Sequence, residues 1–288
     1  MNQKQARPAW HPQGVSGWLQ PGAYGAAEQF FDEARGLRAD HLRLAITATH
    51  WGSEDGRAWV RWLAGNAAKS FGLTIALYRQ MPAVAPALPP VRASEAAAYY
   101  QLVQELGHAL ADHGEWLELA DPLGPPVWPA VSSTGATLLN DLRLPGGLRL
   151  CLGGLPLDPA WVEAARVNGV LGSAAALAFC YWPPEQDVSF LLNAVIETVG
   201  AHQTLPLWLT PERLPARAVE QGRLRTCVGD CARLIESAAD RVYFPLRPAP
   251  TPQRRPLGGP ATGTEVLMAR LLREDGQALR NLRELLAA

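Results

Sequence analysis

Short apolar segments with β-strand character alternate with amphipathic helical segments along almost the whole chain, and this alternation restricts the fold more than any other feature. The strand-like segments are short and bounded by turn-forming residues. The helical segments between them carry apolar residues at intervals of three and four. We predict eight strands, at 14–19, 42–47, 73–79, 116–120, 148–152, 175–181, 205–210 and 241–244, with the clearest helices at 26–37, 54–71, 94–113 and 216–239.

A repeating strand–helix order of this length predicts a parallel sheet closed into a barrel. Open, doubly wound sheets show the same alternation, but they carry a glycine-rich phosphate-binding turn of the GxGxxG type. The nearest candidate here, Gly153-Gly154, lacks the third glycine. We therefore predict an α/β fold, a single (β/α)8 TIM barrel domain over residues 1–288, with a proline-rich loop at 245–261 before the last helix.

The composition excludes several classes of protein. Hydrophobic residues make up 48% of the 288 residues, charged residues 18%, and the formal net charge is −1, so a basic nucleic-acid surface is not expected. The N-terminal segment has no apolar core of the secretory type, and no apolar run reaches the length of a membrane span. We expect a cytoplasmic protein with no metal or organic cofactor, no nucleic-acid partner and no membrane association.

The four cysteines lie in or beside predicted strands and one helix, which suits a reducing compartment. Cys227 and Cys231 share a helical face, and the alternative for them is metal binding or a redox pair, although no second ligand pair lies nearby. The segment 264–286 has a leucine-rich side and is interpreted as the closing helix of the barrel; a partner-binding helix is the alternative.

Two carboxylates stand at predicted strand ends beside prolines. Asp121 closes the fourth predicted strand and Glu212 the seventh, and they are 91 residues apart, or about three strand–helix units of roughly 31 residues. Proline-rich stretches follow the third, fourth and eighth strands, on the face where barrel enzymes build their sites. A pair of carboxylates in such a position is what hydrolysis of a glycosidic bond requires.

Four segments of the chain resemble glycoside hydrolase clan A barrels, particularly the xylosidase-like families. They are LRLAITATHW, WLELADPLGPPVWP, the stretch from LRLCLGGLPLDP to AFCYWPP, and the stretch from LPLWLTPERLP to VYFPLRP, which together span nearly the whole chain. The resemblance implies a (β/α)8 fold, a general acid/base after strand four and a nucleophile at the end of strand seven. Asp121 and Glu212 are the catalytic candidates on this basis.

The sequence departs from the family pattern at the positions that carry the chemistry. Asp121 replaces the family's glutamate and is one methylene shorter, an offset of about an ångström that can cost ~10²-fold in rate. Ala120 replaces the sugar-binding asparagine and cannot donate a side-chain hydrogen bond. Pro211 stands at the nucleophile position with Glu212 one residue later, so Glu212 turns to the opposite face unless a bulge corrects the register.

The resemblance and the strand ends also suggest residues that contact a substrate. Arg43 either orients a carboxylate in the barrel mouth or is a buried structural arginine paired with an acid. His50 either lines the cleft or is a structural hydrogen-bonding residue. Glu118 is expected to point into a helix–strand layer or to pair with a basic residue, and not to catalyse. The predicted substrate-binding residues are Arg43, His50, Trp51, Trp128, Tyr181, Trp182 and Phe244, the aromatic ones among them by stacking on a sugar ring.

Three hypotheses follow from the sequence. The first is a hydrolase-like barrel that has lost standard hydrolysis and serves as a carbohydrate-binding or scaffolding protein, a pseudoenzyme with a glycan ligand or a protein partner. The second is an active glycosidase that uses Asp121 and Glu212. The third is a different barrel enzyme that transfers protons on a small molecule with His50, Arg43 and the carboxylates.

Overall fold

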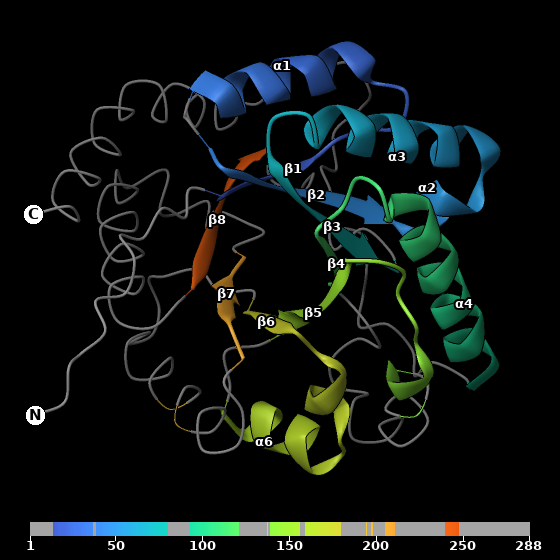
Figure 1. The fold of residues 1–288 in the computed structure, drawn as a ribbon, viewed down its shortest axis with the longest axis vertical. Helices are drawn as coiled ribbons and strands as arrows, with labels where there is room; N and C mark the ends of the chain where they lie inside the picture. Colours follow the sequence, from blue (N-terminus) through green and yellow to red (C-terminus); the bar gives the residue numbers. More distant parts are fainter. Residues whose placement is uncertain are drawn as a thin grey trace, which may run out of the picture.

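The computed structural model describes residues 14–36, 39–79, 93–120, 139–155, 159–179, 205–210 and 240–247, together with the single residues 137, 194 and 197. Its strands form one closed parallel barrel in chain order, which confirms the predicted (β/α)8 fold (Figure 1). The strands are β1 (Gly14–Trp18), β2 (His41–Thr47), β3 (Gly72–Tyr78), β4 (Trp116–Leu119), β5 (Arg149–Leu155), β6 (Ala176–Phe179), β7 (Leu207–Leu209) and β8 (Arg241–Arg247).

The helices pack around the outside of this barrel. In Figure 1, α1 and α3 lie along the outside of the first strands, α4 lies beside α2, and α6 lies near β6. The described helices are α1 (Tyr24–Gly36), α2 (Ala48–Gly52), α3 (Glu54–Ala67), α4 (Ala93–Leu110), α6 (Pro159–Val167) and the 3₁₀ helix η1 (Val170–Ser173). The helices predicted at 216–239 and 264–286, and with them Cys227 and Cys231, lie outside the described residues.

Alternation along each strand separates two sets of side chains. Leucine, isoleucine and valine side chains of the strands point outward and form one core with the helices, as shown by Leu42, Leu44, Leu73 and Ile75, all at most 1% exposed. Aromatic residues of the helices complete this outer layer, among them Phe30 and Trp59. Burial of this apolar layer is the main source of the barrel's stability.

The opposite set of side chains fills the inside of the barrel. Trp116 of β4 meets Trp208 of β7 with ring centroids 4.6 Å apart, although these strands are not neighbours in the sheet. Thr74 of β3 likewise reaches Tyr243 of β8, with 2.9 Å between their hydroxyl oxygens. Such contacts pass through the interior, so the inside of the barrel is a packed core, as it is in other (β/α)8 barrels.

Two side-chain N-caps stabilise the first turns of α2 and α3, the helices that follow β2. Thr47 caps α2: its hydroxyl accepts a hydrogen bond from the backbone N–H of His50, and the His50 ring accepts one from the backbone of Thr47. Ser53 caps α3 in the same manner, accepting from the N–H of Gly56. None of the helices in the described residues has the length and apolar character needed to cross a membrane.

Candidate functional site

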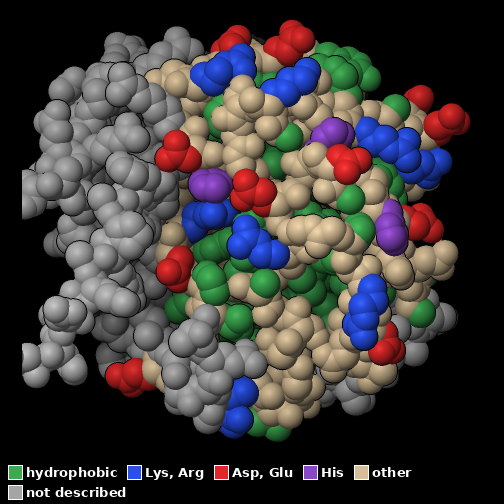
Figure 2. All heavy atoms as spheres, in the orientation of Figure 1, with side chains coloured by type: hydrophobic (Ala, Val, Ile, Leu, Met, Phe, Trp, Pro, Cys, Tyr) green, Lys and Arg blue, Asp and Glu red, His purple; other side chains and the backbone are tan. Residues whose placement is uncertain are grey.

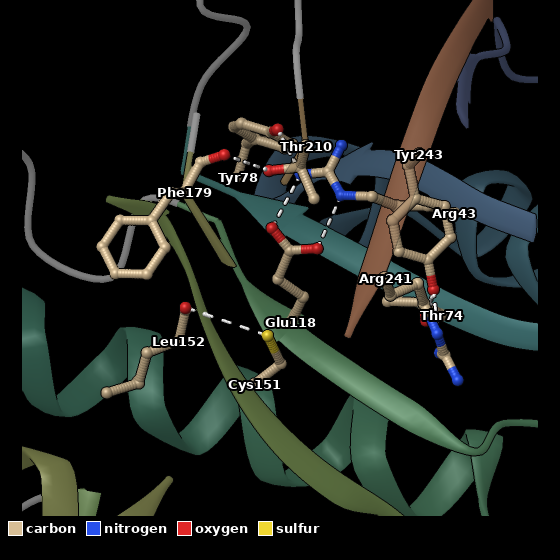
Figure 3. A network of polar contacts seen from close by, with 10 residues as sticks. All are labelled: Arg43, Thr74, Tyr78, Glu118, Cys151, Leu152, Phe179, Thr210, Arg241 and Tyr243. Carbon is tan, nitrogen blue, oxygen red and sulfur yellow. Dashed lines mark hydrogen bonds and ion pairs between the residues drawn. The ribbon is translucent and has the colours of Figure 1, made fainter. Parts of the chain in front are cut away.

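A buried ion pair occupies the middle of the barrel. The Nε of Arg43 donates to one carboxylate oxygen of Glu118 at 2.6 Å, and the Nη2 of Arg43 donates to the other at 2.7 Å. The same Nη2 donates to the hydroxyl of Tyr78 at 2.8 Å. Figure 3 shows the guanidinium of Arg43 and the carboxylate of Glu118 turned toward each other across the barrel interior. Arg43 is 1% exposed and Glu118 is fully buried.

This ion pair confines the Glu118 carboxylate to a structural role. Both of its oxygens accept hydrogen bonds from one guanidinium, the bidentate arrangement that is strongest for this pair of groups. Glu118 is the only carboxylate among the buried described residues. A catalytic acid or nucleophile has to reach the reacting atoms, and Glu118 is buried against Arg43, which agrees with the prediction that it pairs with a base instead of catalysing.

A glycine on the neighbouring strand makes room for this carboxylate. A Cβ atom on Gly153 of β5 would lie 1.9 Å from Oε1 of Glu118. The adjacent Gly154 has φ +66°, and a Cβ there would lie 1.6 Å from the carbonyl oxygen of Ala120. The pairing of β5 with β6 shifts register at this point, so the Gly-Gly sequence marks a β-bulge beside the ion pair.

Toward Arg241 the interior holds mainly apolar, uncharged side chains, which form the cluster Trp116, Cys151, Ala176, Ala178, Trp208 and Tyr243. Tyr243 exchanges a hydrogen bond with Thr74 and accepts one from Arg241 Nη1 at 3.1 Å. Burial raises the pKa of the Tyr243 hydroxyl, which therefore stays protonated at neutral pH. Burial likewise raises the pKa of the Cys151 thiol, and the nearby Glu118 charge adds to this effect. Cys151 is accordingly an inert thiol and not a nucleophile.

An aromatic pair lies at the end of the barrel where the strands finish. Trp18 is the last residue of β1 and Tyr78 the last of β3, and their ring centroids are 4.7 Å apart at an interplanar angle of 45°. Tyr78 is buried, whereas Trp18 is only partly buried. The two rings share a cluster with three small residues, Ala45, Ala76 and Ala120. Trp18 is the partly exposed member of this cluster, and its three alanines are at most 3% exposed.

Sequence reasoning missed Trp18 and Tyr78. The available signal was positional: both residues are aromatic and each comes one residue before the end of a predicted strand, and the carboxyl ends of the strands form the functional face of a barrel. The sequence interpretation instead followed the strands that end in carboxylates. Arg43, which it did select, lies beneath this aromatic pair, with its guanidinium carbon 5.8 Å from the centre of the Tyr78 ring.

The structure places three of the predicted substrate-binding residues. Arg43 is paired with Glu118, which is the second of the two roles considered for it. His50 takes part in the capping box of α2 and is half-buried, and burial lowers the pKa of its ring. Trp51 is 3% exposed and belongs to the outer hydrophobic core, with Arg61 5.7 Å from the centre of its ring. Contact of these residues with a substrate stays a prediction.

The remaining predicted site residues cannot be placed in this geometry. Asp121, Trp128, Tyr181, Trp182 and Glu212 lie outside the described residues, and the side chain of Phe244 does so as well. In sequence, Asp121 directly follows Ala120, and Glu212 comes two residues after Thr210, which is fully buried. Their catalytic roles therefore stay predictions. Among the described residues, no three His, Cys, Asp or Glu side chains are grouped so as to hold a metal ion.

Comparison with known proteins supports the fold. No family model matches the sequence, and no curated protein matches it. A β-mannanase from Thermomonospora fusca, solved in complex with mannohexaose, is 14% identical with a TM-score of 0.55, covering 90% of this chain and 82% of the mannanase. A family 39 glycoside hydrolase from Bacteroides cellulosilyticus WH2 is 12% identical with a TM-score of 0.51, covering 81% of this chain and 56% of the hydrolase.

The same barrel also resembles an enzyme of a different class. A truncated 3-deoxy-D-arabino-heptulosonate 7-phosphate synthase from Thermotoga maritima is 12% identical with a TM-score of 0.50, covering 97% of this chain and 89% of the synthase. At these identities the likeness concerns the fold alone, because one barrel fold supports many unrelated chemistries. The chain therefore has the (β/α)8 fold found in glycoside hydrolases, at low sequence identity to them.

Proposed function

We propose that this barrel binds a carbohydrate at the C-terminal ends of its strands and does not hydrolyse it by the standard two-carboxylate mechanism. The observation that carries the proposal is the Trp18–Tyr78 pair at the ends of β1 and β3. The ligand is a pyranose-containing glycan, because the C–H face of such a ring is apolar and packs on an indole.

The residues around the aromatic pair support binding of a ring-shaped ligand. Ala45, Ala76 and Ala120 end in methyl groups, so the described side chains that share a cluster with Trp18 and Tyr78 are all small. The charge of Arg43 beneath it is balanced by Glu118. A neutral, partly apolar surface at the strand ends suits a neutral sugar, because removing such a sugar from water costs less free energy than removing a charged ligand.

Two features support the loss of hydrolysis. Glu118, the buried carboxylate of β4, is held by Arg43 through both oxygens. Ala120, which follows β4, has no side-chain group that can hydrogen-bond a sugar hydroxyl next to the reacting carbon. A hydrolase needs one carboxylic acid and one carboxylate on either side of the scissile bond, and the two candidates for these roles, Asp121 and Glu212, lie outside the described residues.

The experiment that tests the proposal pairs a binding assay with an activity assay on one protein preparation. Glycan-array binding identifies the ligand class, and a panel of aryl glycosides with activated leaving groups then tests turnover of the sugars that bind. An activated leaving group needs little general-acid help, so even a poorly placed Asp121 would not hide activity. We expect binding of at least one glycan without turnover; no binding on the array contradicts the proposal.

A second candidate function is hydrolysis by Asp121 and Glu212. It is favoured by sequence position, since Asp121 comes one residue after Ala120 and Glu212 two residues after Thr210, both buried at the ends of their strands. Turnover of an aryl glycoside that is lost in Glu212→Gln would establish this candidate and overturn the non-hydrolytic proposal. Carboxyl groups ~6.5–9.5 Å apart would then give inversion, and ~5–5.5 Å retention.

A further inference from the structure

The opposite end of the barrel, where the strands begin, is closed by stacked aromatic and basic side chains. Arg149 lies with its guanidinium carbon 3.9 Å from the centre of the Trp116 ring, and Arg241 lies 4.8 Å from the centre of the Trp208 ring. The two indoles meet edge to face. His41, the first residue of β2, joins this layer through Arg241. We call these five residues the barrel floor.

Arg241 is held in the floor by neutral groups. Its Nη1 donates to the Tyr243 hydroxyl, and its Nη2 lies 3.4 Å from Nε2 of His41. Arg241 is half-buried, and no described carboxylate forms an ion pair with it. A guanidinium has five N–H donors, and buried or half-buried charges in proteins are normally paired. Arg241 therefore has donors left for a further ligand, at a partly exposed position.

The proton position on His41 follows from the same contact. Arg241 can only donate, so Nε2 of His41 must accept and Nδ1 must carry the proton. Nδ1 is buried and has no hydrogen-bond partner. Burial and the Arg241 charge lower the pKa of His41, which keeps the ring neutral in this tautomer.

Trp116 adds another unused donor to the floor. Its Nε1 is buried without a hydrogen-bond partner, and the residue is 4% exposed. An indole N–H can only donate. The floor thus has two buried donors with no described acceptor, Nδ1 of His41 and Nε1 of Trp116, and buried donors in native proteins are rarely left unsatisfied. Nδ1 of His41 faces Gly72 and Glu115, so it lies on the side of the ring away from Arg241.

The acidic groups nearby do not supply the missing acceptors. Glu115 is half-exposed and contacts Arg149 only at 3.9 Å. Asp240 accepts a hydrogen bond from the backbone N–H of Leu207 at 2.8 Å. Asp40 and Glu115 act on His41 through space, without hydrogen bonding to it. Figure 2 shows basic, acidic and histidine side chains interspersed on the face that it draws.

We propose that the barrel floor is a binding site for a small oxyanion of the size of inorganic phosphate, with the Arg241 guanidinium as its principal ligand. An oxyanion accepts several hydrogen bonds at once, and a planar guanidinium matches its geometry better than any other side chain. Arg149, stacked on Trp116, contributes a second positive charge at the edge of the site. The site is separate from the strand ends where we propose carbohydrate binding, so either proposal can fail without the other.

Thermal unfolding with inorganic phosphate tests this site. We expect phosphate, compared with chloride at equal ionic strength, to raise the melting temperature of the wild type, by on the order of 3 °C at about ten times the Kd. Arg241→Gln should abolish the rise. Arg61→Gln is the matched control, because Arg61 also stacks on a tryptophan but lies on α3. An equal rise in Arg241→Gln, or an equal effect of chloride, overturns the proposal.

NMR spectra of His41 in the wild type test the site even if the Arg241→Gln variant does not fold. Long-range ¹H–¹⁵N spectra report the two ring nitrogens separately, and phosphate bound at the floor should shift the His41 signals in a saturable manner. The His113 signals serve as the internal reference, since His113 is exposed. Unchanged His41 signals at phosphate concentrations that stabilise the protein would place the anion elsewhere and contradict the assignment.

Discussion

Gly153 and Glu118 lie so close together that the carboxylate of Glu118 fits only because position 153 has no side chain. A Cβ at position 153 would stand 1.9 Å from Oε1 of Glu118 and 2.5 Å from its Cδ. The bidentate pair between Glu118 and Arg43 therefore exists because β5 carries a glycine opposite the carboxylate. The Gly-Gly bulge of β5 therefore allows the negative charge of Glu118 to lie against the positive charge of Arg43 inside the barrel.

Gly153→Ala should destabilise the protein by about 2–5 kcal/mol, because overpacking adds to displacement of a buried charge from its partner. Urea unfolding monitored by tryptophan fluorescence measures the change. Gly65→Ala is the matched control: the nearest atom to a Cβ there is 3.8 Å away, on His113, and the residue lies within α3. That control should be neutral or stabilising by up to ~1 kcal/mol, and equal effects of the two variants would contradict the steric argument.

The Arg43–Glu118 pair should show strong coupling in a double-mutant cycle. Glu118→Gln and Arg43→Met each leave a buried partner uncompensated, and each should cost about 3–5 kcal/mol in the free energy of unfolding. The double variant should lose clearly less than the sum of the two single losses, because it removes both charges. Additive losses in urea unfolding would show that the two groups do not stabilise each other.

Stability should fall as the pH drops below the ordinary histidine range, because burial lowers the pKa of His41 and of His50 beneath 6.5. Between the folded and unfolded pKa values the unfolded chain binds more protons, so the free energy of unfolding decreases with falling pH. The combined variant His41→Gln/His50→Gln should show a shallower decrease of melting temperature between about pH 7.5 and 5.5. The control is His113→Gln, and a wild-type slope in the combined variant would contradict the prediction.

The sequence was sufficient to predict the fold because the strand–helix alternation is regular over the described part of the barrel. The predicted strand at 73–79 corresponds to β3, Gly72–Tyr78, and the predicted helix at 54–71 to α3, Glu54–Ala67. The spacing of apolar residues within each of these segments is typical of a strand or of a helix, so the local sequence is enough to predict which of the two forms. The exact ends depend on capping contacts such as that of Ser53 with Gly56, which the pattern alone does not fix.

The candidate site was harder to predict because its contacts join residues far apart in the chain. Arg43 and Glu118 are 75 residues apart, and nothing local in either strand identifies the other as its partner. Trp18 and Tyr78 meet only once β1 and β3 are placed around the same barrel. The place of His50 and Trp51 after β2 does not reveal that His50 takes part in a capping interaction or that Trp51 belongs to the outer core.

Substitution of Trp18 tests the central proposal that the strand ends form a carbohydrate-binding surface. Trp18→Ala removes the indole next to Tyr78, and Tyr24→Ala is its control, since Tyr24 is a 45% exposed aromatic on α1 that packs on Trp59 and Trp62. Circular dichroism and thermal unfolding would establish that both variants fold.

The most direct measurement is calorimetric titration of wild type, Trp18→Ala and Tyr24→Ala with an oligosaccharide selected on the glycan array. We expect Trp18→Ala to weaken binding about 5–30-fold, the ~1–2 kcal/mol of one stacked aromatic ring, and Tyr24→Ala to bind like the wild type. Wild-type affinity in a folded Trp18→Ala protein would contradict carbohydrate binding at the ends of β1 and β3.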